Sequence, residues 1–509
     1  MQYILLQSVV VPIAAAAACY LAAGRLGKNV GWIALLGIAA STLLLLAGGA
    51  GTVFGGGSIA ESYLWAGSAQ AKVLTFGFLA DGLSFPVVVV MNLVLAATAV
   101  YSMPYMEKRI RTLYGGEKPA RFGLYYLNLL LVSAGLTGIA LSTNLIELYL
   151  FLEMVLIPTF VIISLFGYAK KERVGIIYII WNQLGAFIFL AGIAVAYAKT
   201  QSFMIGDLSK ADGSSLAYWI VALVLIGWLV KMGIFGLHMW LPITEAEPPT
   251  SFAPVMAVVS GIGTYVIARV LVLGMPSTFQ AFSLPLMVWA VITMFYAGAV
   301  TLVQDDVKYI FAWSTMSQNA YSVLGLASFS MLGVAGGVFY FASHIIGKFV
   351  MFAVAGILLT QTGLRDVKKM GGLAGKMPFT AALFVMGALI LSAVPPTSGF
   401  QAEWMMFAGI FTQGATGSSA YLAVAILGLV ATLFTVAYTF WPVRRIFFGP
   451  LAPSLEGAKD APLTMTLPLL AMVVVSIAIG IYPDLVSGFL MKFFTGLTSI
   501  HFVGGVIPA

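Results

Sequence analysis

Long apolar runs, separated by short polar stretches, repeat along the chain from one end to the other. Each run has about twenty residues, which is enough for a helix to cross the ~30 Å hydrocarbon core of a bilayer. The runs are continuous and do not alternate with polar residues, so they favour helices over the strands of a membrane barrel. The pattern therefore predicts an all-α polytopic membrane protein. We place fourteen membrane-spanning segments at 3–23, 31–49, 78–101, 122–142, 144–168, 174–198, 216–238, 252–274, 281–303, 309–329, 332–360, 379–411, 419–443 and 463–482.

Two of these segments differ from the others in a way that affects the prediction. The segment 379–411 is longer than the others and contains Pro395 and Pro396. Proline removes a backbone donor and kinks or breaks a helix, so we expect this segment to bend or to split. The first segment, 3–23, has no basic residue before it and is long enough to span, which indicates a first membrane span and not a cleaved signal peptide.

Lysine and arginine are distributed unevenly between the predicted loops. Loops that follow odd-numbered segments hold 18 of the 25 basic residues, whereas loops after even-numbered segments hold only Lys72, Lys199 and Lys210. Cytoplasmic loops of membrane proteins are enriched in basic residues. The asymmetry therefore predicts that both termini lie on the non-cytoplasmic side of the cell membrane or of an energy-transducing inner membrane. It also supports fourteen segments, because a missed segment would invert the pattern downstream of it.

Composition narrows the class of function. The chain is 61% hydrophobic and 8% charged, whereas soluble domains are roughly 25% charged. The net charge of +7 follows from the basic loops, so we expect no nucleic-acid partner. A single cysteine, Cys19, excludes a disulfide framework and a cysteine-ligated cluster, and the scattered His238, His344 and His501 argue against haem or zinc. The glycine-rich stretch 48–57 lacks the strand and helix of a nucleotide-binding loop, so we expect it to be a flexible loop.

The segment 144–168 carries two carboxylates, Glu147 and Glu153. Glu147 lies about one turn into the predicted helix, and we expect its side chain to reach the membrane interface. Glu153 lies about 9 Å further along, at ~1.5 Å per residue, which is too deep for that. A buried, unpaired carboxylate is costly, so Glu153 should be protonated, paired or hydrated. A pair that only locks two helices together is the simpler alternative to a functional role, and we favour the functional role.

Basic residues occupy comparable depths in later segments. Lys231 lies deep in the segment 216–238, shortly before glycines and a proline that indicate a break in the helix. His238 follows seven residues later, which places it on the same face if the helix continues. His344 and Lys348 are four residues apart and share a face of the segment 332–360.

An acid follows in the broken segment, where Glu403 comes shortly after Pro395, Pro396 and Gly399. Buried acids and bases at similar depth suit a proton relay, in which each group passes a proton to the next, often through water. The predicted relay consists of Glu153, Lys231, His238, His344, Lys348 and Glu403. For any one of these residues, a structural ion pair remains the alternative.

Eight stretches resemble one known family and occur in that family's order, from about residue 78 to residue 484. They are FLADGLSFP (78–86), NLIELYLFLEMVLIP (144–158), KMGIFGLHMWLP (231–242), QDDVKYIFAWSTMSQ (304–318), SHIIGKFVMF (343–352), RDVKKMGGLAGKMP (365–378), PPTSGFQAEW (395–404) and RRIFFGP (444–450). Together they resemble the antiporter-like subunits of respiratory complex I. The similarity is greatest to the M-type chain, subunit 4 of NADH:quinone oxidoreductase.

The resemblance implies a fold of fourteen helices with two inverted five-helix repeats, in which the seventh and twelfth helices are discontinuous. It divides the chain into N-terminal helices at 1–121, a first repeat at 122–274, a second repeat at 281–443, and a C-terminal helix and tail at 444–509. It also implies roles for residues that match the family's positions. Glu153 matches the fifth-helix glutamate and Lys231 the lysine that pairs with it, His344 and Lys348 match the eleventh-helix pair, and Glu403 matches the twelfth-helix glutamate of M-type chains.

The sequence departs from the family at three places. Gly261 stands where the family usually has a lysine on the eighth helix, Ile243 and Glu245 replace an acid and a histidine, and Gln318 follows Ser317 where a histidine is usual. The middle of the predicted relay therefore has fewer titratable side chains than in the family. His238, Glu245 or ordered water can bridge the gap, and the sequence does not decide between them.

The resemblance implies a proton-translocating subunit whose redox chemistry occurs elsewhere. We expect no cofactor and no metal in this chain, and we expect iron–sulfur clusters and a flavin or other redox cofactor in partner subunits. The expected partners are sister antiporter-like chains, other membrane subunits, a peripheral redox arm and lipid. Three alternatives stay open: the D-type subunit of a multisubunit Na⁺/H⁺ antiporter, an ion-pumping subunit of a membrane-bound hydrogenase, sulfur-reducing complex or deazaflavin-dependent dehydrogenase, and a passive scaffold whose buried charges only lock helices.

Overall fold

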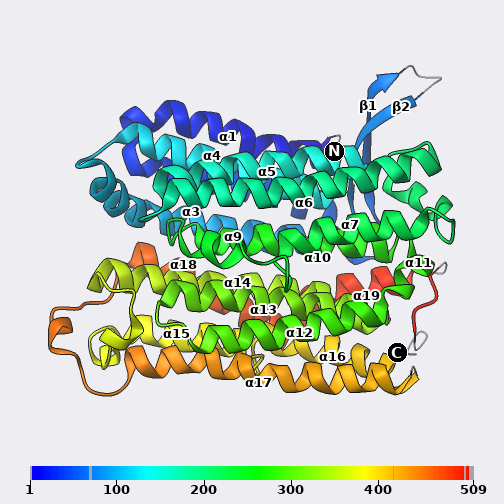
Figure 1. Cartoon of the computed structure of the whole chain (residues 1–509). Helices are drawn as coiled ribbons and strands as arrows, with labels where there is room; N and C mark the ends of the chain where they lie inside the picture. The colour runs from blue at the N-terminus through cyan, green and yellow to red at the C-terminus, as the bar shows by residue number, and fades with distance from the viewer. Residues whose placement is uncertain (1–2, 68–71, 417, 498–499, 504–509) are drawn as a thin grey trace.

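The structure is a bundle of helices that run side by side along one direction (Figure 1). It is a computed structural model that describes residues 3–67, 72–416, 418–497 and 500–503. The longer helices are α1 (Ile4–Leu26), α2 (Val30–Phe54), α3 (Ser84–Tyr114), α4 (Pro119–Leu141), α5 (Leu145–Phe166), α6 (Lys171–Thr200), α7 (Ala217–Met232), α12 (Ser283–Leu302), α13 (Val307–Ala327), α14 (Met331–Thr362), α15 (Pro378–Leu391), α16 (Ser398–Thr416), α17 (Ser419–Phe447) and α18 (Leu463–Ile481).

Shorter elements connect and complete these helices. The short α-helices are α8 (Leu241–Ala246), α9 (Ala253–Gly261), α10 (Gly263–Val266), α11 (Pro276–Ala281) and α19 (Ser487–Thr495). The 3₁₀ turns are η1 (Gly27–Asn29), η2 (Ile205–Lys210), η4 (Val367–Lys369), η5 (Leu373–Gly375), η6 (Pro453–Leu455) and η7 (Pro483–Leu485), and η3 (Ile267–Val272) is a π-helix. The strands are β1 (Ile59–Gly67) and β2 (Lys72–Ala80).

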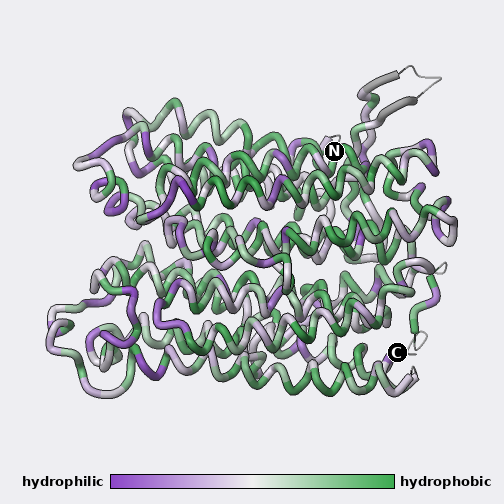
Figure 2. Tube along the Cα trace, in the orientation of Figure 1, coloured by the Kyte–Doolittle hydropathy of each residue, from purple (hydrophilic) through white to green (hydrophobic). Residues whose placement is uncertain are grey.

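The bundle has the polarity of a multi-pass membrane protein. Within the described residues, ten segments are long and apolar enough to cross a membrane, and the first of them, Ile4–Phe54, contains both α1 and α2. Figure 2 shows hydrophobic residues along the helices and hydrophilic ones gathered mainly at the two ends of the bundle. A few hydrophilic positions also lie midway along the helices, and the candidate site is built from such positions.

Helix α14 lies at the centre of the bundle and positions the second half of the site. It packs against α13, α15, α16, α18, α3 and α9, and nearly all of its apolar core is buried. Small residues make the close packing possible: a Cβ added to Gly336 would collide with the backbone of Met406 on α16. Lysine and histidine side chains on α14 are consequently held at fixed positions far from solvent.

Two helices are interrupted within the bundle. Helix α7 ends at Met232, where Gly233 adopts a left-handed conformation with φ of 68°, and the chain turns before α8 begins at Leu241. The segment expected to bend or split is divided into α15 and α16, and Ala393 in the gap has φ of 52°. Both expected interruptions are therefore present, and each leaves backbone groups available for side-chain contacts inside the bundle.

The region between α2 and α3 differs from the sequence-based expectation. Residues 78–80 belong to strand β2, which pairs with β1 in an antiparallel hairpin, and the helix that follows begins only at Ser84. Only Asp81 and Gly82 interrupt the apolar residues between β2 and α3, so hydropathy alone merged a strand with a helix. The expected loop at 48–57 is also wrong in part, because α2 continues through Phe54.

Candidate functional site

Lys231 lies in the last turn of α7, directly before the break, and only 3% of its surface is exposed. Its ammonium group donates a hydrogen bond to the backbone carbonyl of Asn182 on α6 (Nζ–O 3.0 Å). The break frees backbone groups that side chains then satisfy: Trp240 donates to the carbonyl of Val230 (2.8 Å), and Asn319 on α13 donates to that of Met232 (2.9 Å). The lysine is therefore surrounded by polar backbone and side-chain groups inside an otherwise apolar bundle.

Glu153 on α5 lies on the other side of the same stretch of α6. Gln183 donates a hydrogen bond to its carboxylate (Nε2–Oε1 3.4 Å), and the neighbouring residue Asn182 is the one that accepts from Lys231. Helices α5 and α7 both pack against α6, so this stretch of α6 lies between the two charged side chains. Among the residues that the structure describes, no ion pair joins the two, so the direct pairing implied by the family resemblance is absent from this conformation.

His238 does not share a helix face with Lys231. Since α7 ends at Met232, the seven-residue spacing no longer corresponds to two helical turns, and the histidine lies in the irregular chain before α8. Its Nδ1 accepts a hydrogen bond from the N–H of Gly236 (3.1 Å), and its ring packs against three aromatic rings. These belong to Phe235, Tyr296 and Trp313, at centroid distances of 5.8, 5.2 and 5.6 Å. The spacing argument for His238 was therefore wrong, although the residue is buried next to the break.

His344 and Lys348 lie on α14, four residues apart as expected, and both are buried. Lys348 donates hydrogen bonds to the backbone carbonyl of Phe311 (2.7 Å) and to the hydroxyl of Ser314, both on α13. Glu245 lies on α8, which packs against α13, the helix that supplies both hydrogen-bond acceptors of Lys348. Glu245 is completely buried, and neither of its carboxylate oxygens has a hydrogen-bond partner among the described protein groups. A carboxylate buried in this way depends on the charge of Lys348, on a proton or on water.

The structure explains why no large side chain is needed at Gly261. A Cβ added there would lie 2.6 Å from the ring of Phe341 on α14, so the aromatic ring fills the space that a longer residue would occupy. Beside it, Asn319 also donates a longer hydrogen bond to the hydroxyl of Ser260 (3.3 Å). Polar groups around the gap between Lys231 and Lys348 are therefore Ser260, Asn319 and Glu245, and not a basic residue on α9.

Beyond Lys348 a network of hydroxyl and amide groups leads toward Glu403. Gln318 on α13 donates to the hydroxyl of Tyr438 on α17 (2.9 Å) and accepts from Tyr340 on α14 (2.8 Å). Tyr438 in turn contacts the hydroxyl of Thr435 (3.1 Å). Glu403 lies on α16, which packs against both α14 and α17. It also lines a cleft of about 300 Å³ beside Trp404 and Phe407, so the network ends at an opening on the side of the bundle.

Glu147 departs from its expected place at the interface. It is fully buried, and the N–H of Gly77 in strand β2 donates a hydrogen bond to one of its oxygens (3.1 Å). The hairpin covers the start of α5 and separates this carboxylate from the surface. Because the hairpin was missed in the sequence, its effect on Glu147 was missed with it.

The arrangement is a row of titratable groups that crosses the bundle from α5 to α16. The groups in its middle are buried, whereas Glu153 and Glu403 at its two ends are partly exposed. The row starts at Glu153, continues through Lys231, Glu245 and Lys348 with His344 beside it, and ends at Glu403. Sequence reasoning did not identify Asn182, Asn319, Gln318, Tyr340 or Tyr438 as connecting groups. Their common signal is a polar side chain inside an apolar helix, which was visible in the sequence but not assigned to this row. Charged groups linked by polar side chains can exchange protons.

Two curated relatives have similar sequences. An NAD(P)H-quinone oxidoreductase chain 4 of Synechococcus sp. is 29% identical over 479 residues, which is 91% of this chain and 86% of the relative. A D-type subunit of the Na(+)/H(+) antiporter from Alkalihalophilus pseudofirmus is also 29% identical, over 68% of this chain and 70% of its own length.

Two solved structures share the fold. The Mrp complex from Dietzia sp. contains a chain that superposes with a TM-score of 0.85 at 21% identity, covering 98% of both chains. Respiratory complex I from Thermus thermophilus contains one with a TM-score of 0.80 at 22% identity, covering 96% of this chain and 99% of the other. A family match extends over residues 142–435, more than half of the chain, and includes every residue of the row described above. The chain therefore belongs to the NADH:quinone oxidoreductase/Mrp antiporter transmembrane family.

Proposed function

We propose that this chain is a proton-translocating membrane subunit of a complex I-type oxidoreductase. The observation that carries the proposal is the row of acids and bases from Glu153 to Glu403, buried in its middle and partly exposed at its two ends, which passes two helix breaks inside an apolar bundle. Charged residues at membrane depth are costly and typically mark ion paths. Two relatives from energy-transducing complexes, a quinone oxidoreductase and an antiporter, resemble the chain in sequence over most of its length.

The proposed mechanism depends on the cost of an uncompensated charge. When Glu153 and Lys231 approach each other, their attraction favours a protonated lysine; when they separate, Lys231 loses that support and releases its proton. Glu245 lies next along the row and compensates the charge of Lys348. We infer that a proton passes from Lys231 through the region of Ser260, Asn319 and Glu245 to Lys348, and then through the tyrosine network toward Glu403. His344 and His238 are the remaining proposed members, since each has a ring nitrogen without a hydrogen-bond partner among the described protein groups.

We also propose fourteen membrane-spanning segments and two inverted repeats, at 122–274 and 281–443, between N-terminal helices at 1–121 and a C-terminal region at 444–509. Equivalent local structures support the repeats. The side chain of Asn144 caps α5, and its backbone forms a bridge with Met204. The side chain of Asp306 caps α13, and its backbone forms a bridge with Asp366. Each repeat also has one interrupted helix.

The proposed orientation places the basic end of the bundle in the cytoplasm. Helix α1 begins and α19 ends near the same end of the bundle, together with the hairpin (Figure 1). An even number of crossings, such as fourteen, is needed for that arrangement. Basic residues concentrate in loops at the opposite end, and cytoplasmic loops are typically basic. Both termini are therefore proposed to face the non-cytoplasmic side.

The proposed partners are sister antiporter-like chains, other membrane subunits and a peripheral arm that carries iron–sulfur clusters and a flavin or other redox cofactor. The second candidate function is a D-type subunit of a multisubunit Na⁺/H⁺ antiporter, and it is favoured by the similarity to such a subunit and by the fold shared with the Mrp complex. Mass spectrometry of subunits that co-purify with the native complex separates the two. Iron–sulfur and cofactor-binding chains are expected, and small membrane partners alone would favour the antiporter.

The role of the row is tested with Glu153→Gln. The substitution keeps the size of the side chain but removes its charge, so we expect proton transport to be lost while the complex still assembles. Transport is measured in proteoliposomes with a pH-sensitive dye, and assembly by native gel. Glu172→Gln, at an exposed position of α6, is the matched control and should transport normally. Normal transport by the Glu153 variant would reject the proposed role, and failed assembly would favour a structural lock.

A further inference from the structure

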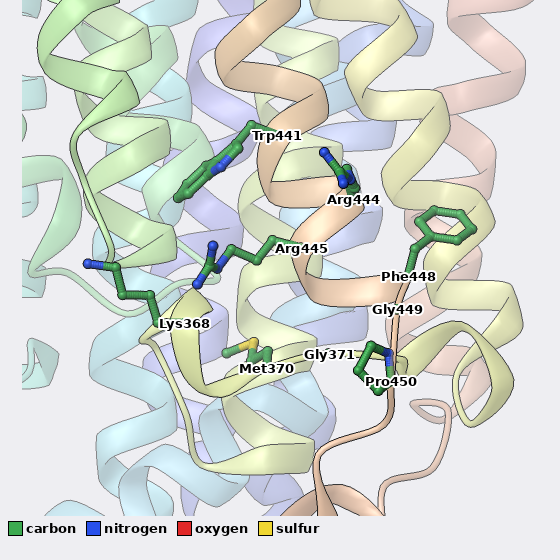
Figure 3. A pocket seen from close by; sticks show the side chains of 9 residues that line it. All are labelled: Lys368, Met370, Gly371, Trp441, Arg444, Arg445, Phe448, Gly449 and Pro450. Carbon is green, nitrogen blue, oxygen red and sulfur yellow. The ribbon is translucent and has the colours of Figure 1, made fainter.

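A pocket of about 540 Å³ lies at the end of α17, far from the row of titratable groups (Figure 3). Two segments that are distant in sequence form it: the loop after α14, and the last turns of α17 with the loop that follows them. The pocket is lined by Lys368, Met370, Gly371, Trp441, Arg444, Arg445, Phe448, Gly449 and Pro450. The loops are joined where the N–H of Gly372 donates to the carbonyl of Phe448. The shape of the pocket is therefore fixed by a backbone hydrogen bond between the two segments.

The pocket has an uncompensated positive charge. Lys368 is paired with Asp305 (Nζ–Oδ2 2.5 Å), and in Figure 3 its ammonium group is turned away from Arg445. Arg444 and Arg445 are exposed, and neither forms an ion pair with any residue that the structure describes. No acidic side chain lines the pocket. Two guanidinium groups without a carboxylate partner provide planar donors that suit an oxyanion such as phosphate.

The surface of α17 that leads from the pocket toward the middle of the membrane is apolar. Helix α17 exposes large hydrophobic residues along its length, among them Leu429, Leu433 and Val436. Arg444 follows Leu433 by eleven residues, which is close to three helical turns, so it lies at the end of the same helix face. Trp441 has the position expected of an aromatic residue at the membrane–water interface, and the guanidinium of Arg445 lies 5.8 Å from its ring.

We propose that this pocket binds the phosphate of an anionic phospholipid, whose acyl chains lie along the exposed face of α17. The headgroup phosphate would be held by Arg444 and Arg445, next to the exposed ring of Phe448. A soluble phosphate would use the two arginines but not the apolar face that leads to them. A lipid uses both, and basic pockets at the ends of membrane helices commonly recognise anionic headgroups.

The experiment compares the intact complex with a complex that carries Arg444→Gln and Arg445→Gln. Bound lipids are identified by native mass spectrometry after purification in mild detergent. Binding is then measured as the rise in melting temperature on adding phosphatidylglycerol, with phosphatidylcholine and inorganic phosphate as comparison probes. The control carries Lys118→Gln and Arg173→Gln, which removes two exposed positive charges at the same end of the bundle but outside the pocket.

We expect the wild type and the control to retain phosphatidylglycerol and to be stabilised by it, and not by phosphatidylcholine. The arginine variant should bind it about tenfold more weakly. Equal retention by the arginine variant would overturn the proposal. Equal stabilisation by inorganic phosphate would indicate a free phosphate site instead, and loss of a partner subunit with unchanged lipid binding would indicate that the arginines bind an acidic protein surface. This proposal does not depend on the proposed proton path.

Discussion

At the scale of single residues, Glu245 is the group whose importance could not be settled from the sequence. Glu245 is three residues from Pro242 and from Pro248, and nothing around it in the sequence indicates that it lies near Lys348, because α8 and α14 are about a hundred residues apart. By contrast, the depth of Lys231 and Lys348 followed directly from their place in apolar runs, and both are buried as expected. Burial of a residue can be predicted from its own helix, whereas its partner depends on how the helices pack.

We expect Glu245→Gln to lower proton transport by about tenfold or more, since tenfold corresponds to about 1.4 kcal/mol and opposite charges in a buried site interact by more than that. The glutamine preserves the volume, so assembly should be retained. Transport is measured in proteoliposomes over a range of pH, with Glu456→Gln, an exposed position, as the control. A merely structural role would lower the melting temperature without changing the pH profile. Unchanged transport at every pH would remove Glu245 from the path.

At the scale of elements, the positions of the long helices were predictable and the exceptions have physical causes. An apolar run of twenty residues specifies a membrane helix because every backbone group must be satisfied within the segment. The strand β2 was missed because its apolar residues continue into α3, with Asp81 and Gly82 as the only signal of a boundary. Helix α19 was missed because nine residues are too few to form a recognisable membrane run.

The break in α7 is the element on which the position of Lys231 depends. We expect Gly233→Ala to destabilise the protein by about 1–2 kcal/mol or more, because alanine is strained at φ of 68° and its Cβ would lie 2.5 Å from Leu241. Transport should fall as the lysine shifts. Gly236→Ala isolates the backbone strain, since φ is 87° but the space around it is open.

The third substitution in this series is Gly51→Ala in α2. The φ of Gly51 is in the ordinary helical range, and a Cβ added there would meet no atom of another element within 4 Å. Gly51→Ala should leave the free energy of unfolding unchanged or raise it by up to about 1 kcal/mol, because alanine favours a helix more than glycine does. Melting temperatures in detergent rank the three variants. If Gly233→Ala melts no lower than Gly51→Ala, the conformation of Gly233 does not hold the break in place.

At the scale of the whole molecule, the orientation in the membrane is the prediction that rests on charge alone. The chain has one cysteine, Cys19, which is buried, so a cysteine introduced at the surface can be labelled against a low background. Lys118 is exposed at the basic end of the bundle, and Ser209 is exposed in η2 at the opposite end. In intact cells we expect a membrane-impermeant thiol reagent to label Ser209→Cys but not Lys118→Cys, and to label both after the membrane is permeabilised. The reverse pattern would place both termini in the cytoplasm. The row of titratable groups would keep its geometry, but each end of the bundle would then face the opposite compartment.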